Sequence, residues 1–285
     1  MSSAVAARVE GLSKSFRRRG HSVEAVREVS FELERGGSIA VVGESGSGKT
    51  TVARCLTGLE RPTAGTIEVC GRARGNERVS ASERRRRARE MQMIFQDPYG
   101  SLNPRYKIGE SVARTALLHG TATKAEAGAY AEALLARVGL PQAAGDTYPR
   151  KLSGGQRQRA AIAVALAVEP EVLVLDEAVA ALDLSIQAQV LNLLAKIRAE
   201  AGISFVFISH DLSVVRQITE TIVVMRRGEV VERGRTREVL RDPQHEYTKR
   251  LVASVPRPGW DPHALLGRER PPAAATSRPT SDADR

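Results

Sequence analysis

Three short apolar runs mark the buried strands that the sequence predicts. They are SIAVV at 38–42, VLVL at 172–175 and ISFVFIS at 203–209, and all three are continuous rather than alternating. Continuous runs of this length are typical of parallel strands that are covered on both faces. Because the carboxyl ends of parallel strands meet at one edge of a sheet, the polar residues after each run are expected to gather there.

Weaker patterns predict the elements around these strands. Apolar residues alternate with polar ones at Val29, Phe31 and Leu33, which indicates an antiparallel strand with one buried face. Antiparallel strands are expected at 9–16, 25–33 and 66–70, helices at 51–56, 108–118, 124–138 and 157–168, and a hairpin at 220–234 with its turn at Arg227-Gly228.

The segment GESGSGKT directly follows the first apolar run and opens a helical segment. It fits the phosphate-loop pattern, in which glycines let backbone N–H groups close around phosphate oxygens. Lys49 would lie between the β- and γ-phosphates of a nucleotide, and the Thr50 hydroxyl would bind Mg²⁺. A chance glycine-rich turn is the alternative, and the strand and helix on either side argue against it. The expected nucleotide-binding residues of this segment are Gly43, Glu44, Ser45, Gly46, Ser47, Gly48, Lys49, Thr50 and Thr51.

Ionisable residues follow the other two apolar runs. Asp176 is suited to the Mg²⁺ shell, and Glu177 is suited to act as the general base that polarises an attacking water. His210 would bring an imidazole to the same edge. Taken alone, the acidic pair could simply begin a helix and the histidine could lie in a loop. The phosphate loop upstream favours the catalytic interpretation of all three.

LSGGQRQR at 152–159 places a serine and two glycines before a long helical segment. A helix start of this kind has free N–H groups and could contact a second phosphate. It could equally be an ordinary capped helix, because Ser153 is a good N-cap residue.

In this order, these motifs resemble the ATPase subunits of ATP-binding cassette (ABC) transporters, whose signature sequence is LSGGQ. The resemblance covers residues 5–255 and implies an α/β fold: a P-loop NTPase core with a mixed sheet, an antiparallel β-subdomain and an α-helical subdomain within a helical insertion at 98–165. Residues 235–255 would form a C-terminal extension, and the Pro-, Ala-, Ser- and Arg-rich residues 256–285 are expected to be disordered.

The same resemblance implies a head-to-tail dimer, in which the signature of one subunit contacts the γ-phosphate held by Lys49 of the other. It also assigns Gln96 to the Mg²⁺ and water shell and to sensing the membrane partner, and it places His210 on the γ-phosphate. The other residues implied are Phe16, which stacks on adenine, Ser153, Gly154, Gly155 and Gln156 of the signature, and Asp183 of the loop that communicates across the dimer.

Two further segments resemble the oligopeptide, dipeptide and nickel importer branch of this family. They are MIFQDPYGSLNPR at 93–105 and PQHEYTKRLVASVPRP at 243–258, although turn signals alone could explain the first. The expectation is an ATP-hydrolysing subunit that energises uptake of peptides or a related solute. Its partners would be permease subunits, a second identical or related ATPase subunit and, indirectly, an extracytoplasmic solute-binding protein. The alternatives are a soluble cassette ATPase acting on ribosomes or DNA, and an exporter subunit.

The chain departs from the family pattern at three places. Ala180 stands where serine is usual in the dimer-communication loop, and Arg150-Lys151 replaces a His-Glu pair common before the signature. A C-terminal cysteine cluster found in some sister subunits is absent from the sequence. Because Ala180 lacks the serine hydroxyl, we expect ATP hydrolysis to survive with altered coupling. Arg150-Lys151 inverts the charge at its position, which puts the interdomain contacts expected there in doubt.

Length and composition agree with a cytosolic enzyme, and any membrane association would be through a partner; with the resemblance, this implies a peripheral location on the cytoplasmic face of the cell membrane. The 285 residues are 42% hydrophobic, and the longest apolar stretch, 160–168, is far shorter than the ~20 residues of a membrane span. Cys55 and Cys70 lack metal-ligand spacing, which points to a reducing compartment. The net charge of +10 raises the question of nucleic acid, but ERRRRARE at 83–90 has no interleaved aromatics. We interpret that run as a solvated helix face and expect no direct nucleic-acid contact.

Overall fold

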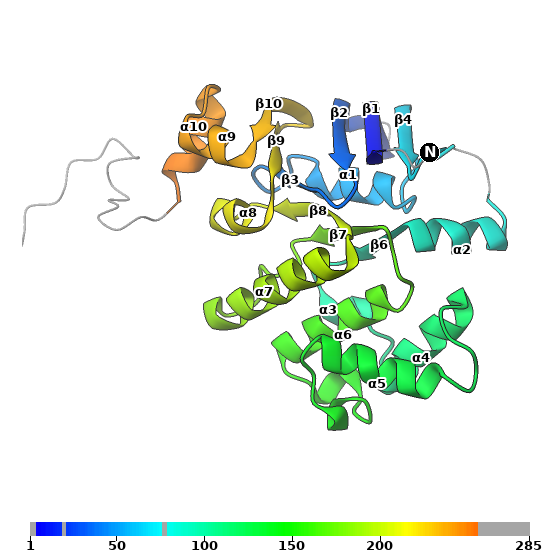
Figure 1. Ribbon diagram of the computed structural model, residues 1–285. Helices are drawn as coiled ribbons and strands as arrows, with labels where there is room; N and C mark the ends of the chain where they lie inside the picture. Colours follow the sequence, from blue (N-terminus) through cyan, green and yellow to red (C-terminus); the bar gives the residue numbers. More distant parts are fainter. Residues whose placement is uncertain (1–3, 19–20, 76–78, 256–285) are drawn as a thin grey trace, which may run out of the picture.

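The structure is a computed structural model that describes residues 4–18, 21–75 and 79–255. A central mixed sheet has the strand order β10-β9-β3-β8-β7-β6, and a second, antiparallel sheet has the order β2-β1-β4-β5 (Figure 1). The central strands are β3 (Ser38–Val42), β6 (Met91–Ile94), β7 (Val172–Asp176), β8 (Ser204–Ser209), β9 (Thr221–Arg226) and β10 (Glu229–Arg235). The antiparallel strands are β1 (Val5–Arg18), β2 (His21–Glu34), β4 (Ala64–Val69) and β5 (Arg72–Ala73).

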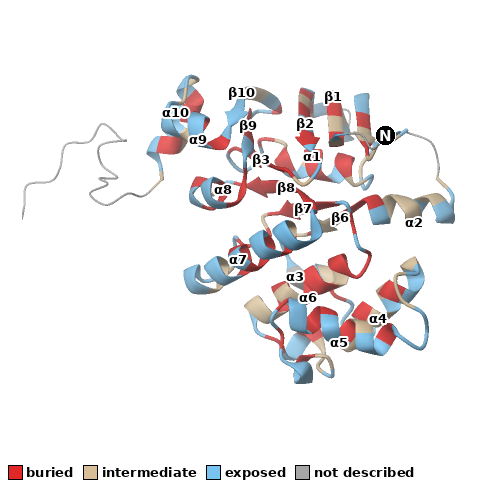
Figure 2. Cartoon of the chain, viewed as in Figure 1, coloured by how far each residue is buried: buried red, intermediate tan, exposed pale blue. Residues whose placement is uncertain are grey.

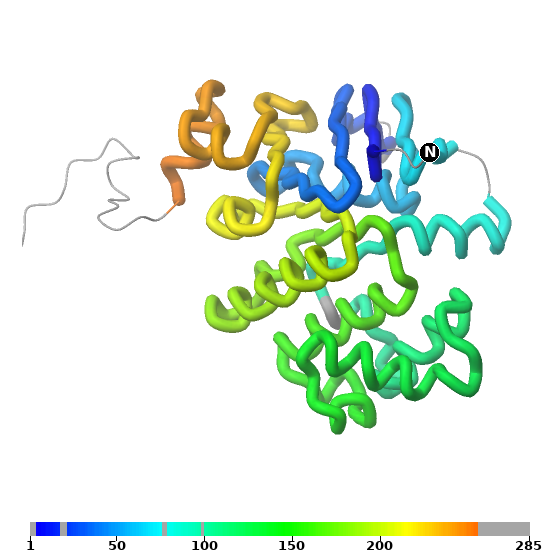
Figure 3. The backbone as a smooth tube through the Cα atoms, in the orientation of Figure 1, coloured from blue at the N-terminus to red at the C-terminus, as the bar shows by residue number. Residues whose placement is uncertain are grey.

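Helices cover the sheets and form a separate layer. After β6 the chain leaves the central sheet, runs through a group of helices and returns at β7 (Figure 3). This group contains α3 (Pro98–Ser101), α4 (Ile108–His119), α5 (Ala127–Arg137), the 3₁₀ turns η1 (Gln142–Ala144) and η2 (Pro149–Lys151), and α6 (Gly154–Leu166). The other helices are α1 (Lys49–Leu56), α2 (Ala81–Glu90), α7 (Leu184–Ala201), α8 (Leu212–Ile218), α9 (Thr236–Arg241) and α10 (Glu246–Ala253).

The two faces of the central sheet pack against different layers. Side chains on a strand alternate between the faces, and on β7 Leu173 and Leu175 lie in one hydrophobic cluster while Val172 and Val174 lie in the other. The first cluster contains residues of α6, α7 and α8, whereas the second contains residues of α1 and of the antiparallel sheet. Figure 2 shows buried residues along the central strands and on the inner sides of the helices. Helices α1 and α6 therefore lie on opposite faces of the sheet.

The structure confirms the three apolar runs as strands, and all residues of β3, β7 and β8 are buried. It also confirms the hairpin, since β9 and β10 flank Arg227 and Gly228. Several boundaries differ from the sequence predictions. The strands predicted at 9–16 and 25–33 extend to 5–18 and 21–34 because they pair with each other over their whole length.

One predicted boundary is wrong, and one further prediction holds only in part. The signature helix starts at Gly154 rather than at Arg157, because Ser153 caps it there. The run at 83–90 is not solvated throughout: Arg84 and Arg85 are exposed, but Glu90 is buried and pairs with Arg74 at 2.8 Å. A buried carboxylate needs such a partner to offset its desolvation.

The expected disorder of residues 256–285 lies outside the described residues. Among the helices that the structure describes, none combines the length and the apolar character needed to cross a bilayer.

Candidate functional site

The predicted site residues lie at the carboxyl ends of four neighbouring parallel strands. Register explains why, since Ile94 pairs with Leu175, Asp176 with Ile208, and Val42 with Ser209. The residues that follow these strand ends therefore lie at one edge of the sheet. They are Gln96 after β6, Glu177 after β7, His210 after β8 and the phosphate loop after β3.

Glu177 is held between Gln96 and His210. Gln96 Nε2 donates to Glu177 Oε2 at 2.9 Å, and His210 Nδ1 lies 3.1 Å from Glu177 Oε1. The Glu177 side chain is 16% exposed, whereas that of His210 is 55% exposed. An ionised carboxylate has about four acceptor positions, so each oxygen can still accept a hydrogen bond from a water molecule. The three residues lie 81 and 33 positions apart in sequence, and the fold brings them into contact.

The backbone of Glu177 adopts an unusual conformation, with a φ of 46°. Its N–H donates to the carbonyl of Ile208 at 3.0 Å, which extends the pairing of β7 with β8 by one residue. A left-handed φ at a residue other than glycine costs of order 1–3 kcal/mol and persists only where surrounding structure enforces it. Such strain is commonly found where a side chain must be aimed at a ligand.

The glycines of the phosphate loop are required by packing as well as by phosphate access. A Cβ at Gly43 would lie 2.2 Å from the carbonyl oxygen of Met225, and one at Gly48 would lie 2.3 Å from that of Ala25. Both residues also have positive φ. The loop therefore rests directly on the backbones of β9 and β2, a constraint that the sequence alone does not indicate.

Lys49 is the first residue of α1 and is 4% exposed. Its Nζ donates to the carbonyl oxygens of Gly43 and Glu44, both at 2.8 Å. Burial lowers the pKa of Lys49, and the nearby Glu177, Asp176 and Glu44 act in the opposite direction. Helix α1 has no side-chain cap, so its first N–H groups remain available to a phosphate.

Asp176 and Thr50 have the donor chemistry that Mg²⁺ prefers. Thr50 Oγ1 donates to Asp176 Oδ1 at 3.2 Å, and Asp176 is 4% exposed. Burial raises the pKa of Asp176, although the hydrogen bond from Thr50 and the charge of Lys49 lower it. No group of three or more acidic, histidine or cysteine ligands was found in the described part of the chain. The hydroxyl of Thr50 and the carboxylate of Asp176 fit Mg²⁺, which is commonly bound through one or two protein groups together with substrate phosphates and water.

Asp176→Asn is expected to raise the melting temperature of the nucleotide-free and metal-free protein at pH 7. Because the folded chain holds a proton on Asp176 more tightly than the unfolded chain does, ionisation reduces stability as pH rises through the raised pKa. The gain in melting temperature should therefore shrink as pH falls through the raised pKa towards the ordinary aspartate pKa of about 4. Thermal melts at several pH values test this, with the exposed Asp183→Asn as control. A lower melting temperature for Asp176→Asn at pH 7 would contradict it.

The signature residues do not join this cluster within one chain. Ser153 and Gln156 form a capping box: Ser153 Oγ accepts from Gln156 N at 3.3 Å, and Gln156 Oε1 accepts from Ser153 N at 3.0 Å. A Cβ on Gly155 would lie 2.5 Å from Ile186 Cγ2, so the segment packs against the start of α7. Between residues 153–156 and the phosphate loop, both of which the structure describes, there is no hydrogen bond or ion pair.

Two other expected residues lie outside the Glu177 cluster. Phe16 is 37% exposed on β1, and Lys14 Nζ lies 4.7 Å from its ring centroid. Asp183 is the exposed residue before α7 and makes no side-chain cap there. Ala180, which lies earlier in the same loop, is also exposed, and its N–H donates to the carbonyl of Glu177 at 3.0 Å. The loop that contains Ala180 is thus directly connected to the backbone of Glu177.

The sequence analysis missed one contact to the phosphate loop. Tyr247 of α10 accepts a hydrogen bond from Glu44 N at 2.9 Å. The sequence singled out the segment at 243–258, but nothing in its pattern indicated that a tyrosine there would reach a residue 203 positions earlier.

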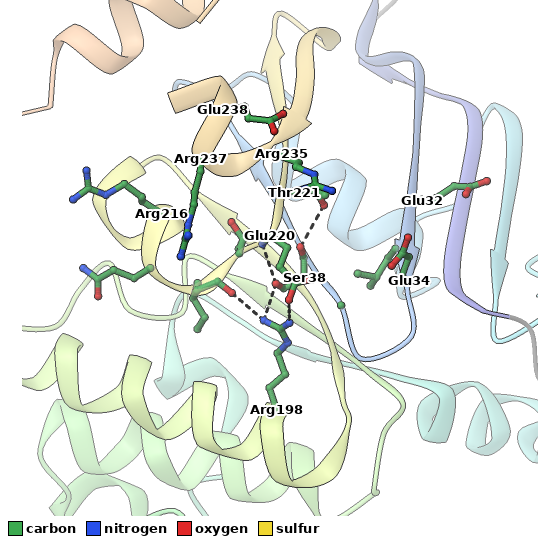
Figure 4. Close-up of a pocket in the computed structure, with 15 residues that line it drawn as sticks. Glu32, Glu34, Ser38, Arg198, Arg216, Glu220, Thr221, Arg235, Arg237 and Glu238 are labelled. Carbon is green, nitrogen blue, oxygen red and sulfur yellow. Dashed lines mark hydrogen bonds and ion pairs between the residues drawn. The ribbon is translucent and has the colours of Figure 1, made fainter. Parts of the chain in front are cut away.

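A cavity of about 720 Å³ lies at the opposite edge of the central sheet, next to the amino ends of β3 and β9. Figure 4 shows Arg198 extending into it, where the guanidinium donates to Ser38 Oγ at 2.8 Å and pairs with Glu220. The cavity is therefore separate from the candidate site. The candidate site itself is open, with Glu44, Thr50, Gln96 and His210 all exposed.

Comparisons with known proteins place this arrangement in context. A family model described as ABC transporter matches residues 26–180, which include the phosphate loop, Gln96, the 153–156 segment and Glu177. The dipeptide transport ATP-binding protein DppF of Escherichia coli (strain K12) is 45% identical over 235 residues, covering 82% of this chain and 70% of that protein. The di/tripeptide transport ATP-binding protein DppF of Pseudomonas aeruginosa (strain UCBPP-PA14) is 44% identical over 246 residues, covering 86% and 75%. Among solved structures, the dimeric post-hydrolysis state of the ATP-binding cassette MJ0796 bound to ADP and Pi has a TM-score of 0.73 and 27% identity, covering 81% of this chain and 98% of that chain.

Proposed function

The chain belongs to the ABC transporter family and is an ATP-binding, ATP-hydrolysing cassette, and we propose that it drives a peptide importer. The single observation that carries the importer assignment is the 45% identity to a dipeptide transport subunit over 82% of the chain. We assign residues 5–255 to the cassette, 98–165 to its helical insertion and 235–255 to its C-terminal extension.

In the proposed hydrolysis step, Glu177 accepts a proton from the water that attacks the γ-phosphate. The bond between the γ-phosphorus and the β,γ-bridging oxygen breaks, and ADP and phosphate leave. Contacts with Gln96 at 2.9 Å and His210 at 3.1 Å support this role, because they orient the carboxylate. His210 would then contact the γ-phosphate, and Phe16 would stack on adenine.

Lys49 and the phosphate loop would hold the β- and γ-phosphates, and Thr50, Asp176 and Gln96 would hold Mg²⁺. When bound, Mg²⁺ would neutralise part of the charge that develops on the phosphates. The hydrogen bond from Thr50 to Asp176 at 3.2 Å supports this assignment, because it places a hydroxyl and a carboxylate together at the start of α1.

We further propose that the working unit is a head-to-tail dimer. Helix α6 lies on the face of the sheet opposite α1, so the signature at its start is well placed to serve a second subunit instead of its own phosphate loop. The open surface at Gln96 and His210 supports the same proposal. The dimeric state of the MJ0796 cassette with ADP and Pi is consistent with it. Ser153 to Gln156 would then complete the partner's nucleotide site, and Asp183 would lie near the dimer contact.

The proposed location is the cytoplasmic face of the membrane, where the chain would bind permease subunits. The segment after Gln96, which leads into the helical group, is the proposed docking region. A solute-binding protein would deliver the peptide from the other side and contact this chain only through the permease.

Co-purification tests the importer proposal directly. A tagged Glu177→Gln form, isolated from native membranes with ATP and Mg²⁺, is expected to bring down a multispanning permease and a solute-binding protein identifiable by mass spectrometry. A matched preparation without nucleotide controls for contacts that do not depend on the ATP-bound state. Recovery of ribosomal or DNA-repair proteins without a permease would overturn the importer assignment and favour a soluble cassette ATPase.

A further inference from the structure

Tyr247 links the C-terminal helix α10 to the first residues of the phosphate loop. Its hydroxyl oxygen accepts a hydrogen bond from Glu44 N at 2.9 Å, and the residue is 6% exposed. A buried hydroxyl is expected to find a partner, because an unpaired one costs desolvation free energy. Here the partner is the backbone N–H of the second residue of the loop.

The position of Tyr247 is determined by contacts at its backbone. The Glu232 carboxylate accepts from Gln244 N at 2.8 Å and from His245 N at 3.1 Å, and so fixes the entry to α10. His245 is the N-cap of that helix, and its Nδ1 accepts from Tyr247 N at 3.0 Å. These contacts hold the backbone at the start of the helix that carries Tyr247.

The ring of Tyr247 is also held. The Arg226 guanidinium lies 5.2 Å from the ring centroid, a distance at which a cation and an aromatic face attract each other. Arg226 ends β9, next to Met225, whose carbonyl oxygen leaves no room for a Cβ on Gly43. The end of β9, the start of the phosphate loop and α10 thus form one packed unit.

Within this unit the contacts of Glu44 separate into two kinds. Its carbonyl oxygen accepts from Lys49 Nζ at 2.8 Å, whereas its N–H is held by Tyr247. Lys49 is also the residue expected to bind phosphate, so its contact with the loop competes with nucleotide. The contact from Tyr247 does not involve Lys49, and it can persist when Lys49 turns to a ligand.

We propose that Tyr247 is a positioning residue that holds the phosphate loop in its ATP-binding conformation, so that the C-terminal extension forms part of the nucleotide site. A glycine-rich loop has many accessible conformations. When only a fraction of molecules has the competent loop, the apparent dissociation constant rises by the reciprocal of that fraction. This inference rests on ATP binding by the chain and does not depend on what is transported.

Tyr247→Phe tests the proposal, because it removes the hydroxyl and keeps the ring against Arg226. Loss of one hydrogen bond of this kind should raise the dissociation constant for ADP and the KM for ATP about three- to tenfold. The kcat should stay within about twofold, because the residue does not touch the reacting atoms. Calorimetric titration with ADP and steady-state hydrolysis measure these quantities on the isolated full chain, independently of any permease.

Tyr130→Phe is the matched control. Its hydroxyl also makes a hydrogen bond within the protein, in this case as the donor to Glu169 Oε1 at 3.3 Å, but it lies on α5 in the helical group. This variant should bind ADP like the unaltered chain, and Tyr247→Ala should weaken binding at least as much as Tyr247→Phe does. Wild-type ADP affinity and KM in Tyr247→Phe would overturn the proposal, as would a fall in melting temperature with unchanged ADP affinity, because the tyrosine would then serve only to pack α10.

Discussion

Glu177→Gln should bind ATP with nearly unchanged affinity while its steady-state hydrolysis falls by about 10²- to 10⁴-fold, the usual contribution of a general base. Glutamine has the same size as glutamate and can still contact Gln96 and His210, which lie 2.9 Å and 3.1 Å from the two carboxylate oxygens. Its neutral amide, however, is a very weak base. Phosphate release measures the loss, and equilibrium titration with ATP measures the retained binding.

The control for this variant is Glu171→Gln. Glu171 lies just before the other end of β7, is exposed and pairs with Arg35, so it tests the loss of a carboxylate away from the site. We expect its hydrolysis to stay within about twofold of the unaltered protein.

In the presence of ATP and Mg²⁺, the Glu177→Gln protein should also accumulate as a dimer in size-exclusion chromatography. Hydrolysis by Glu177→Gln at a near-normal rate would remove Glu177 from the role of base.

Lys49→Ala is expected to weaken ATP binding about 10- to 100-fold and to bring hydrolysis below detection. Hydrogen bonds to charged groups contribute about 1.5–3 kcal/mol each, which corresponds to this range of affinity. The amino group is buried, and desolvation lowers its pKa, so a phosphate partner would offset a charge that is poorly solvated in the free protein. Titration with ATP and with ADP measures the loss.

Lys196→Ala is the corresponding control, because Lys196 is 71% exposed on α7 and faces Glu200 at 3.8 Å. It removes a positive charge from the protein without changing the phosphate loop. ATP binding by this variant should be unchanged. If Lys49→Ala and Lys196→Ala lost affinity equally, the effect would reflect net charge, and the specific role of Lys49 would be excluded.

Lys49→Ala and Glu177→Gln separate nucleotide binding from the chemical step. Lys49 contacts the loop that is expected to hold the phosphates, whereas the hydrogen bonds that the structure describes for the Glu177 side chain are with Gln96 and His210. One variant should therefore lose affinity and the other only turnover. Tyr247→Phe should differ from both, with a moderate loss of affinity and a nearly normal kcat.

The local features of this protein could be read from the sequence because they depend on neighbouring residues. Continuous apolar runs such as SIAVV predict buried strands, since both faces of each strand must be covered. The N-cap at Ser153 and the turn at Arg227-Gly228 depend on the preferences of one or two residues, and both occur in the structure. The order of the motifs indicated an ATPase. Because the carboxyl ends of parallel strands meet at one edge of a sheet, the sequence also placed Asp176, Glu177 and His210 together there.

Tertiary structure decided the contacts between these features. The pairing of Glu177 with Gln96 and His210 depends on strand order and register, which bring together residues that are 81 and 33 positions apart. The placement of α1 and α6 on opposite faces depends on how each crossover passes the sheet. The contact between Tyr247 and Glu44 spans 203 positions and follows from packing of α10 against the end of β9. Local propensity carries no information about such distances, because these contacts form only when the whole core has been assembled.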